Sequence, residues 1–237
     1  MNLDLNNSQR AFCLIKFFSQ ENHYISFKNG CSILRTPHYY RICEDAGRGD
    51  RTESCLGYWD SALGHEMPTL TRDGNPVDMT DIESILVYPV SEQHDAWLQS
   101  WCMIGPDNEF ELSLQRMIEE FGSYFVILPA ENIGNYANLL AKASNLEVRY
   151  GLVQYSENPL HRSLTTKDRK FAYQKEFRFY LGSCPKGEIQ DKTIHLDQSE
   201  KILSDAGSLK LVSPEGKKYY FGLGSKVVIT CARSDST

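Results

Sequence analysis

The chain has 237 residues, and 41% of them are apolar, a proportion typical of a globular protein. Its net charge of −6, from 25 basic and 31 acidic residues, argues against a protein that coats nucleic acid through bulk charge. The first residues lack the basic and apolar regions of a secretory signal, and no window approaches the ~18 apolar residues that span a bilayer. We therefore expect a cytoplasmic protein with no membrane partner.

The first quarter of the chain predicts a strand, a turn and a second strand. Residues 11–18 form a short apolar run, and residues 22–27 fit either a strand or a helix. Lys28-Asn29-Gly30 is typical of a turn because Asn-Gly accepts positive φ. Residues 31–35 then predict a strand that ends at Thr36-Pro37.

Residues 44–80 are mostly polar and contain several turn-forming pairs, which predicts a long, loop-rich insertion. Strand character resumes at residues 82–88 and 96–104. Apolar residues then recur at helical spacing in two segments, 110–121 and 133–143. Between these helices we expect a buried strand at 124–128. The later predicted strands are 148–155, 171–181, 193–196, 209–212, 219–223 and 227–231.

The predicted elements indicate a single α+β domain over residues 1–237, with mostly antiparallel strands and two or three helices. The seven cysteines include no Cys-x-x-Cys pair, and the six histidines show no metal-ligand spacing. We therefore expect reduced thiols and no metal. The sequence also lacks a nucleophile elbow, a phosphate-binding loop of the Walker type and a dinucleotide-binding glycine motif.

The segment FAYQKEFRFYL, residues 171–181, is the strongest local pattern. If all of it is a strand, alternation places Glu176 on the same face as Gln174 and Arg178. This face is either solvent-exposed with one cross-strand ion pair, or it lines a cleft in which Arg178 holds Glu176. A third hypothesis adds Asp50 and Glu53 to Glu176 as the carboxylates of a metal-dependent nuclease.

Aromatic residues cluster near the charged loop AGRGDRTES, residues 46–54. Flat rings such as a base or a nicotinamide stack on aromatic walls, although aromatic residues also fill ordinary cores. The loop is therefore a candidate rim for a cleft above the Gln174, Glu176 and Arg178 row. The aromatic residues are Tyr39, Tyr40, Tyr58, Trp59, Trp97 and Trp101.

Over residues 11–182 the order of segments resembles a broad, poorly characterised bacterial family. The family's members carry an Asn-Asp-Pro-x-Glu segment and a later Tyr-Glu-x-Glu-x-Arg segment. Here the first segment corresponds to RGDRTE, with Gly49-Asp50-Arg51 in place of Asn-Asp-Pro. The second corresponds to YQKEFR, with Gln174 in place of the first glutamate and Glu176 and Arg178 matching. The segments that carry the resemblance are LIKFF, FKNGCSILRTPHYYR, RGDRTE, QSWCMI, FGSYFVIL, VRYGLVQY and KFAYQKEFRFYL.

The layout of that family is similar to ADP-ribosyltransferase-like toxins and phage-defence effectors. The resemblance implies an ADP-ribosyltransferase-like fold and NAD as substrate, with a protein or nucleic-acid target. It implies Glu176 as the catalytic carboxylate, beside Gln174 and Arg178. The NAD-binding residues that it implies are Tyr39, Tyr40, Arg41, Arg48, Asp50 and Ser100.

Other functions remain open at this point. The same cleft would serve a binding protein without catalysis, such as a phage anti-defence inhibitor, an immunity protein or a ligand sensor. The metal-dependent nuclease is the remaining alternative.

Overall fold

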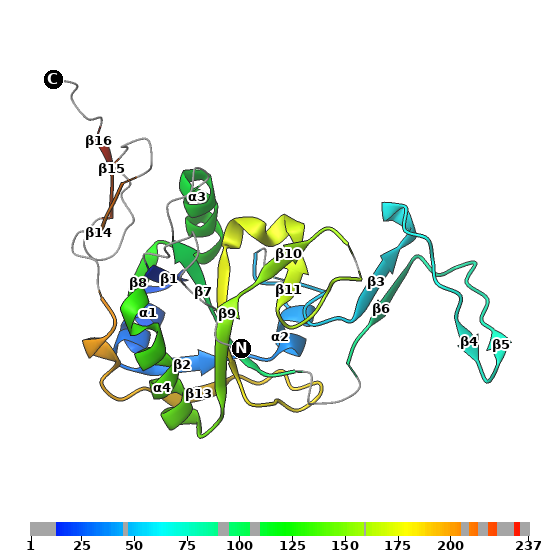
Figure 1. The fold of residues 1–237 in the computed structure, drawn as a ribbon, viewed down its shortest axis with the longest axis horizontal. Helices are drawn as coiled ribbons and strands as arrows, with labels where there is room; N and C mark the ends of the chain where they lie inside the picture. Colours follow the sequence, from blue (N-terminus) through cyan, green and yellow to red (C-terminus); the bar gives the residue numbers. More distant parts are fainter. Residues whose placement is uncertain are drawn as a thin grey trace.

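The computed structural model describes residues 13–44, 47–89, 95–104, 110–158 and 160–204, and the backbone of 209–212, 218–221 and 230–232. A five-stranded sheet forms its centre, in the order β8-β1-β7-β12-β9, with every neighbouring pair antiparallel (Figure 1). This mixed α+β architecture with mostly antiparallel strands confirms the predicted class. The central strands are β8 (Tyr124–Pro129), β1 (Cys13–Phe18), β7 (Trp97–Ile104), β12 (Glu176–Leu181) and β9 (Val148–Leu152).

Four α-helices and several smaller sheets surround the central sheet in the described part of the chain. The helices are α1 (Glu21–Lys28), α2 (Pro37–Ile42), α3 (Phe110–Phe121) and α4 (Ile133–Ser144). The other strands are β2 (Cys31–Leu34), β3 (Gly57–Asp60), β4 (Thr71–Arg72), β5 (Asn75–Pro76), β6 (Ser84–Val87), β10 (Gln154–Ser156), β11 (Thr166–Asp168), β13 (Lys192–His195), β14 (Leu209–Val212), β15 (Lys218–Phe221) and β16 (Thr230–Ala232). Short 3-10 helices lie at Ser61–Leu63, Ala130–Asn132, Arg169–Gln174 and Ser199–Lys201.

The two faces of the sheet are covered by different helices, because side chains alternate along each strand. Leu14 of β1 packs in the cluster that contains Leu140 of α4, and the next residue, Ile15, packs in the cluster that contains Leu114 of α3. The apolar stripes predicted for α3 and α4 therefore face opposite sides of the sheet. Both helices, and the buried strand between them, are confirmed.

Helices flank β2 on both sides, and the sequence does not predict the second of them. The ambiguous segment at 22–27 is helix α1, and a further helix, α2, follows Thr36-Pro37 directly. Thr36 is the N-cap of α2, since its side chain accepts a hydrogen bond from the Tyr39 N–H, and Pro37 occupies the first turn. A Thr-Pro pair was interpreted as a strand stop, but it is equally a helix start. The prediction of two or three helices was therefore too low.

The predicted strand at 171–181 is wrong over its first half. Residues 169–174 form a 3-10 helix that Asp168 caps, and Lys175 adopts a left-handed conformation with φ of 43°. The strand begins only at Glu176. Gln174 therefore does not belong to the alternating face of β12, although Glu176 and Arg178 do. All six residues of β12 are buried, so the interpretation of this face as solvent-exposed is also wrong.

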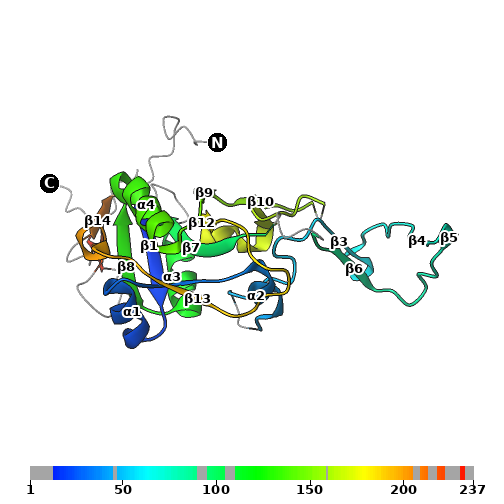
Figure 2. The same ribbon diagram turned by 90° about the horizontal axis from the view of Figure 1, so that it is seen from below.

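The predicted insertion at 44–80 divides into two parts. Residues 47–56 fold onto the body, where Asp50 and Glu53 are buried. Strands β3 and β6 then form a hairpin that carries the small β4–β5 hairpin away from the body, as an arm in both views (Figures 1 and 2). None of residues 61–83 is buried. Across the described ranges, no helix has the length and apolar character needed to cross a membrane.

Candidate functional site

Along one edge of β7 the pairing segment changes at Ser100, from the segment at Arg35 to strand β1, and a cavity lies at this point. Leu98 exchanges backbone hydrogen bonds with Arg35 at 3.0 and 2.7 Å, whereas Cys102 pairs with Ile15 of β1. Beyond Ile15, β1 continues its pairing with β8 alone. Ser100 therefore lies at the gap between two different neighbours of the same edge.

The cavity at this gap has a volume of about 420 Å³, within the ~300–1,000 Å³ range of small-molecule sites. Five basic and three acidic side chains line it, so basic groups outnumber acidic ones by two. The basic residues are Lys16, Arg35, Arg48, Lys167 and Arg178, and the acidic ones are Glu53, Glu176 and Asp191. Aromatic walls come from Phe17, Phe18, Phe27, Tyr40, Trp101 and Phe121.

Arg178 lies between two carboxylates on one wall of the cavity. Its two terminal nitrogens bind the two oxygens of Glu53 at 2.6 and 2.7 Å. Its Nε donates to Glu176 Oε1 at 2.5 Å. Each of these three residues is at most 5% exposed. Because such buried charges are stable only when paired, Arg178 is the residue that allows both carboxylates to lie here.

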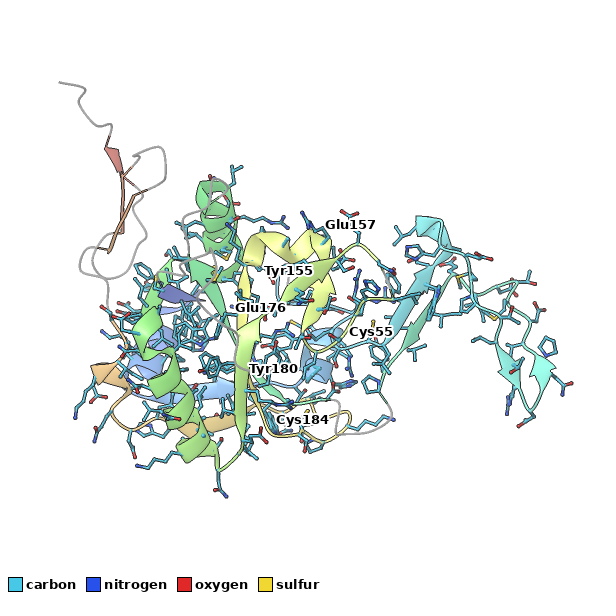
Figure 3. The ribbon with its side chains drawn as sticks, in the orientation of Figure 1. Cys55, Tyr155, Glu157, Glu176, Tyr180 and Cys184 are labelled. Carbon is cyan, nitrogen blue, oxygen red and sulfur yellow. The ribbon has the colours of Figure 1, made fainter. Side chains whose placement is uncertain are left out.

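Glu176 receives further hydrogen bonds from two other elements. Ser100 Oγ donates to Oε1 at 2.5 Å, and Lys167 Nζ donates to Oε2 at 3.1 Å. The backbone N–H of Glu176 donates to the Tyr155 hydroxyl at 2.8 Å, and Figure 3 shows these two residues together inside the body. Gln174 accepts from Lys167 and donates to the Gly47 carbonyl. The carboxylate is thus held from β7, β11 and β12.

The charge state of Glu176 follows from these contacts. Burial disfavours the ionised form, but the charges of Arg178 and Lys167 and the hydrogen bonds outweigh it, so the pKa of Glu176 lies well below its ordinary value. Glu176 is therefore a carboxylate at every physiological pH. Such a group can oppose positive charge on a bound molecule, and it is a poor acceptor of protons.

Lys16 lies at the gap itself. Its Nζ donates to the Ser100 carbonyl oxygen at 2.8 Å, an acceptor on the edge of β7 that β1 does not pair. The rings of Phe27 and Trp101 are 5.9 and 5.8 Å from the nitrogen. Burial, with Arg35 and Arg48 nearby, lowers the pKa of Lys16 to about 7, although Glu176 acts in the opposite sense.

Of the nine residues predicted for the site, six line the cavity and three do not. Tyr39 packs its ring on Arg35, whose guanidinium carbon is 4.2 Å from the ring centre. Arg41 binds the Glu53 carbonyl oxygen at 2.7 Å and Asp95 at 3.3 Å. Asp50 accepts from the Thr52 N–H and hydroxyl. The six lining residues are Tyr40, Arg48, Ser100, Gln174, Glu176 and Arg178.

Glu53 and one oxygen of Asp50, two of the carboxylates of the metal hypothesis, are engaged by other groups, whereas Asp50 Oδ2 is buried without a hydrogen-bond partner. Both oxygens of Glu53 bind Arg178, and Asp50 holds Thr52 in a turn. Within the residues that the structure describes, no three His, Cys, Asp or Glu side chains are grouped so as to hold a metal ion. No observation therefore favours the nuclease alternative.

Sequence reasoning missed three basic residues of the cavity: Lys16, Arg35 and Lys167. Lys16 did carry a signal, since it is the one charged residue in the apolar run CLIKFF. A lysine inside a central strand requires a specific environment. Lys167 lies on a short strand of polar residues, which gives no indication of its burial.

Comparisons with known proteins find no family model, no curated protein and no solved structure that matches this chain.

Proposed function

We propose that the cavity binds a nucleotide and that NAD is the ligand it fits. Arg35 and Arg48 suit a pyrophosphate, because guanidinium groups bind phosphate oxygens with directed hydrogen bonds. The rings of Phe27 and Trp101 suit a flat nicotinamide or adenine. The excess of positive charge in the lining favours an anionic ligand over a neutral one.

We further propose that the protein is an ADP-ribosyltransferase-like enzyme with Glu176 as the catalytic carboxylate. The observation that carries this proposal is an ionised, buried Glu176 on the wall of an aromatic cavity. In the reaction the bond between nicotinamide and the ribose C1′ breaks, and its electron pair leaves on the nicotinamide nitrogen. An acceptor group adds to C1′ and loses a proton. A fixed carboxylate stabilises the positive charge that develops on the ribose.

The biological setting of this proposal rests on the resemblance of the sequence segments. They are similar to those of effectors and toxins in conflict between bacteria and phages, where the acceptor is a protein or a nucleic acid. The ADP-ribosyltransferase-like fold belongs to the same proposal. It is supported by a central antiparallel sheet in which the late strand β12 begins at the proposed catalytic glutamate.

The experiment is incubation of the protein with NAD labelled on the adenylate phosphate, in the presence of a bacterial lysate. We expect label on a macromolecule and release of free nicotinamide, both abolished by Glu176→Gln. Glu131→Gln is the matched control, since Glu131 is exposed on a 3-10 helix and is absent from the cavity lining. Label transfer that Glu176→Gln leaves intact contradicts the assignment.

A second candidate is a ligand sensor without catalysis. The observation that favours it is the saturation of Glu176: Ser100, Lys167 and Arg178 supply four hydrogen bonds to its two oxygens. A carboxylate with that many donors has little capacity left for a ribose hydroxyl. Calorimetric titration with NAD separates the two candidates. Binding without nicotinamide release supports the sensor, and absence of binding contradicts both.

A further inference from the structure

Lys16 has a setting that the proposed NAD chemistry does not use. It comes from the middle of a central strand, and its nitrogen lies at the gap between β1 and β7, where it lines the cavity. Among the described residues its one hydrogen-bond partner is the Ser100 carbonyl, and it forms no ion pair with a described carboxylate. A lysine that needed only to be neutralised would lie beside Glu176, as Lys167 does.

The surroundings of this amine favour its neutral form. Arg35 and Arg48 contribute positive charge, and the half-buried side chain is partly removed from water. Burial comes first and these two cations second in lowering its pKa to about 7. A much larger fraction of Lys16 side chains than of exposed lysines therefore carries a free lone pair at neutral pH.

We propose that Lys16 is a nucleophilic amine that forms an imine with the carbonyl group of a small phosphorylated aldehyde or ketone. The cavity supplies what such a ligand needs. Arg35 and Arg48 bind its phosphate, and the rings of Phe27 and Trp101 flank the reacting nitrogen. A desolvated lysine beside other cations is an established way of activating an amine.

The reaction is balanced without any further reagent. The lone pair of Nζ attacks the carbonyl carbon, and one proton of the nitrogen passes to the carbonyl oxygen to give a carbinolamine. The hydroxyl then leaves as water with the second proton of the nitrogen, and the nitrogen electron pair forms the carbon–nitrogen double bond. The product is the imine of Lys16, and hydrolysis reverses the step.

The charged and titratable side chains around Lys16 come from most of the elements that line the cavity, whereas α3 contributes only Met117 and Phe121. Those that act on it directly are Arg35, Arg48 and Glu176. The complete set in the lining is His23 from α1, Cys31 from β2, Arg35 after it, Tyr40 from α2, Arg48 and Glu53 from the 47–56 loop, Cys102 from β7, Lys167 from β11, Glu176 and Arg178 from β12, and Asp191 before β13. Burial of the amine and the positive charges of Arg35 and Arg48 together are the reason that we expect its reactivity to extend down to neutral pH.

The test uses pyridoxal 5′-phosphate as the probe, with borohydride to reduce the imine and peptide mapping to locate the label. At about neutral pH we expect Lys16 to be labelled at least ~10-fold faster than the exposed Lys142 and Lys186, because its neutral fraction is larger. The rate at which Lys16 is labelled should be half-maximal near pH 7. Labelling of Lys16 no faster than these two lysines overturns the proposal.

Two controls separate the activated amine from simple exposure. Pyridoxal without its phosphate should label Lys16 more slowly. Arg48→Gln removes a cation that lowers the pKa of Lys16 and a partner for the phosphate, so it should slow the phosphorylated probe more than it slows pyridoxal. When the protein is unfolded with urea, the preferential labelling of Lys16 over Lys142 and Lys186 should vanish. A preference that survives unfolding, or equal rates with and without the phosphate, contradicts the proposed cavity chemistry. Because the probe is not NAD, failure of the NAD proposal leaves this result intact, and the reverse also holds.

Discussion

Arg178 and Glu53 lie 125 positions apart in the chain and form a bidentate ion pair with N–O distances of 2.6 and 2.7 Å. Both side chains are 1% exposed. The pair fastens the 47–56 loop to strand β12 of the central sheet. It therefore holds Arg48, from the same loop, against the cavity that Glu176 also lines.

Removal of this cation should be strongly destabilising. Arg178→Met leaves Glu53 and Glu176 buried with only Lys167 to compensate, and we expect a loss of ~3–5 kcal/mol in the free energy of unfolding, measured with urea. Arg72→Met in the arm is the control, because the Arg72 side chain is 88% exposed, and its effect should stay within ~0.5 kcal/mol. Equal effects of the two variants would show that the buried ion pair does not stabilise the fold.

Acid should weaken the fold through Glu176. Its folded-state pKa lies below the ordinary value of 4.5, because Arg178 and Lys167 outweigh its burial. A carboxyl whose pKa is depressed on folding stabilises the protein above its unfolded pKa, and this contribution is lost as the pH falls. We expect the free energy of unfolding to decrease below about pH 4.5, with a shallower decrease in Glu176→Gln. Urea titrations over a pH series measure the slope of the free energy of unfolding against pH for the parent protein and for Glu176→Gln. Identical slopes for the two proteins would contradict the assigned charge state of Glu176.

Two glycines should respond oppositely to alanine. Gly122 ends α3 with φ of 102°, and a Cβ there would lie 2.3 Å from the Phe18 carbonyl oxygen. Gly122→Ala should therefore cost at least ~1–3 kcal/mol. Nothing lies within 4 Å of a Cβ added to Gly134 in α4, so Gly134→Ala should be neutral or gain up to ~1 kcal/mol. Thermal unfolding of both variants checks the pair, and a Gly122→Ala protein as stable as the parent contradicts the packing of α3 on β1.

The arm should be dispensable for the cavity. Asp60 and Ser84 are paired across β3 and β6, so an Asn-Gly turn can replace residues 61–83 without a change of register. Because none of these residues is buried, we expect the free energy of unfolding to stay within ~1 kcal/mol. The affinity for NAD, measured by calorimetry, should be unchanged. A loss of NAD binding in the shortened protein would place part of the site on the arm.

The sequence predicts the parts of this structure that rest on local periodicity. The stripes of α3 and α4 and the buried strand β8 follow from the spacing of apolar residues, and the pairing of Glu176 with Arg178 follows from alternation along β12. It does not predict where long-range pairing ends. The gap beside Ser100 exists because the pairing of β1 with β7 ends at Ile15 and Cys102, and no local pattern encodes that limit.

The same reasoning explains which site residues were missed or misplaced. The family resemblance implies Arg41 and Asp50 as NAD-binding residues. In the structure Arg41 of α2 binds the Glu53 carbonyl oxygen, and Asp50 accepts from Thr52. Lys167 reaches Glu176 from a different strand, a contact that only the tertiary fold creates.

A crystal of the protein soaked with NAD tests the central claim most directly. The account predicts density in the cavity between β1 and β7, with phosphate oxygens at Arg35 and Arg48 and a ribose facing Glu176. Density for NAD on any other surface, or an unfilled cavity at a saturating concentration of NAD, would contradict it.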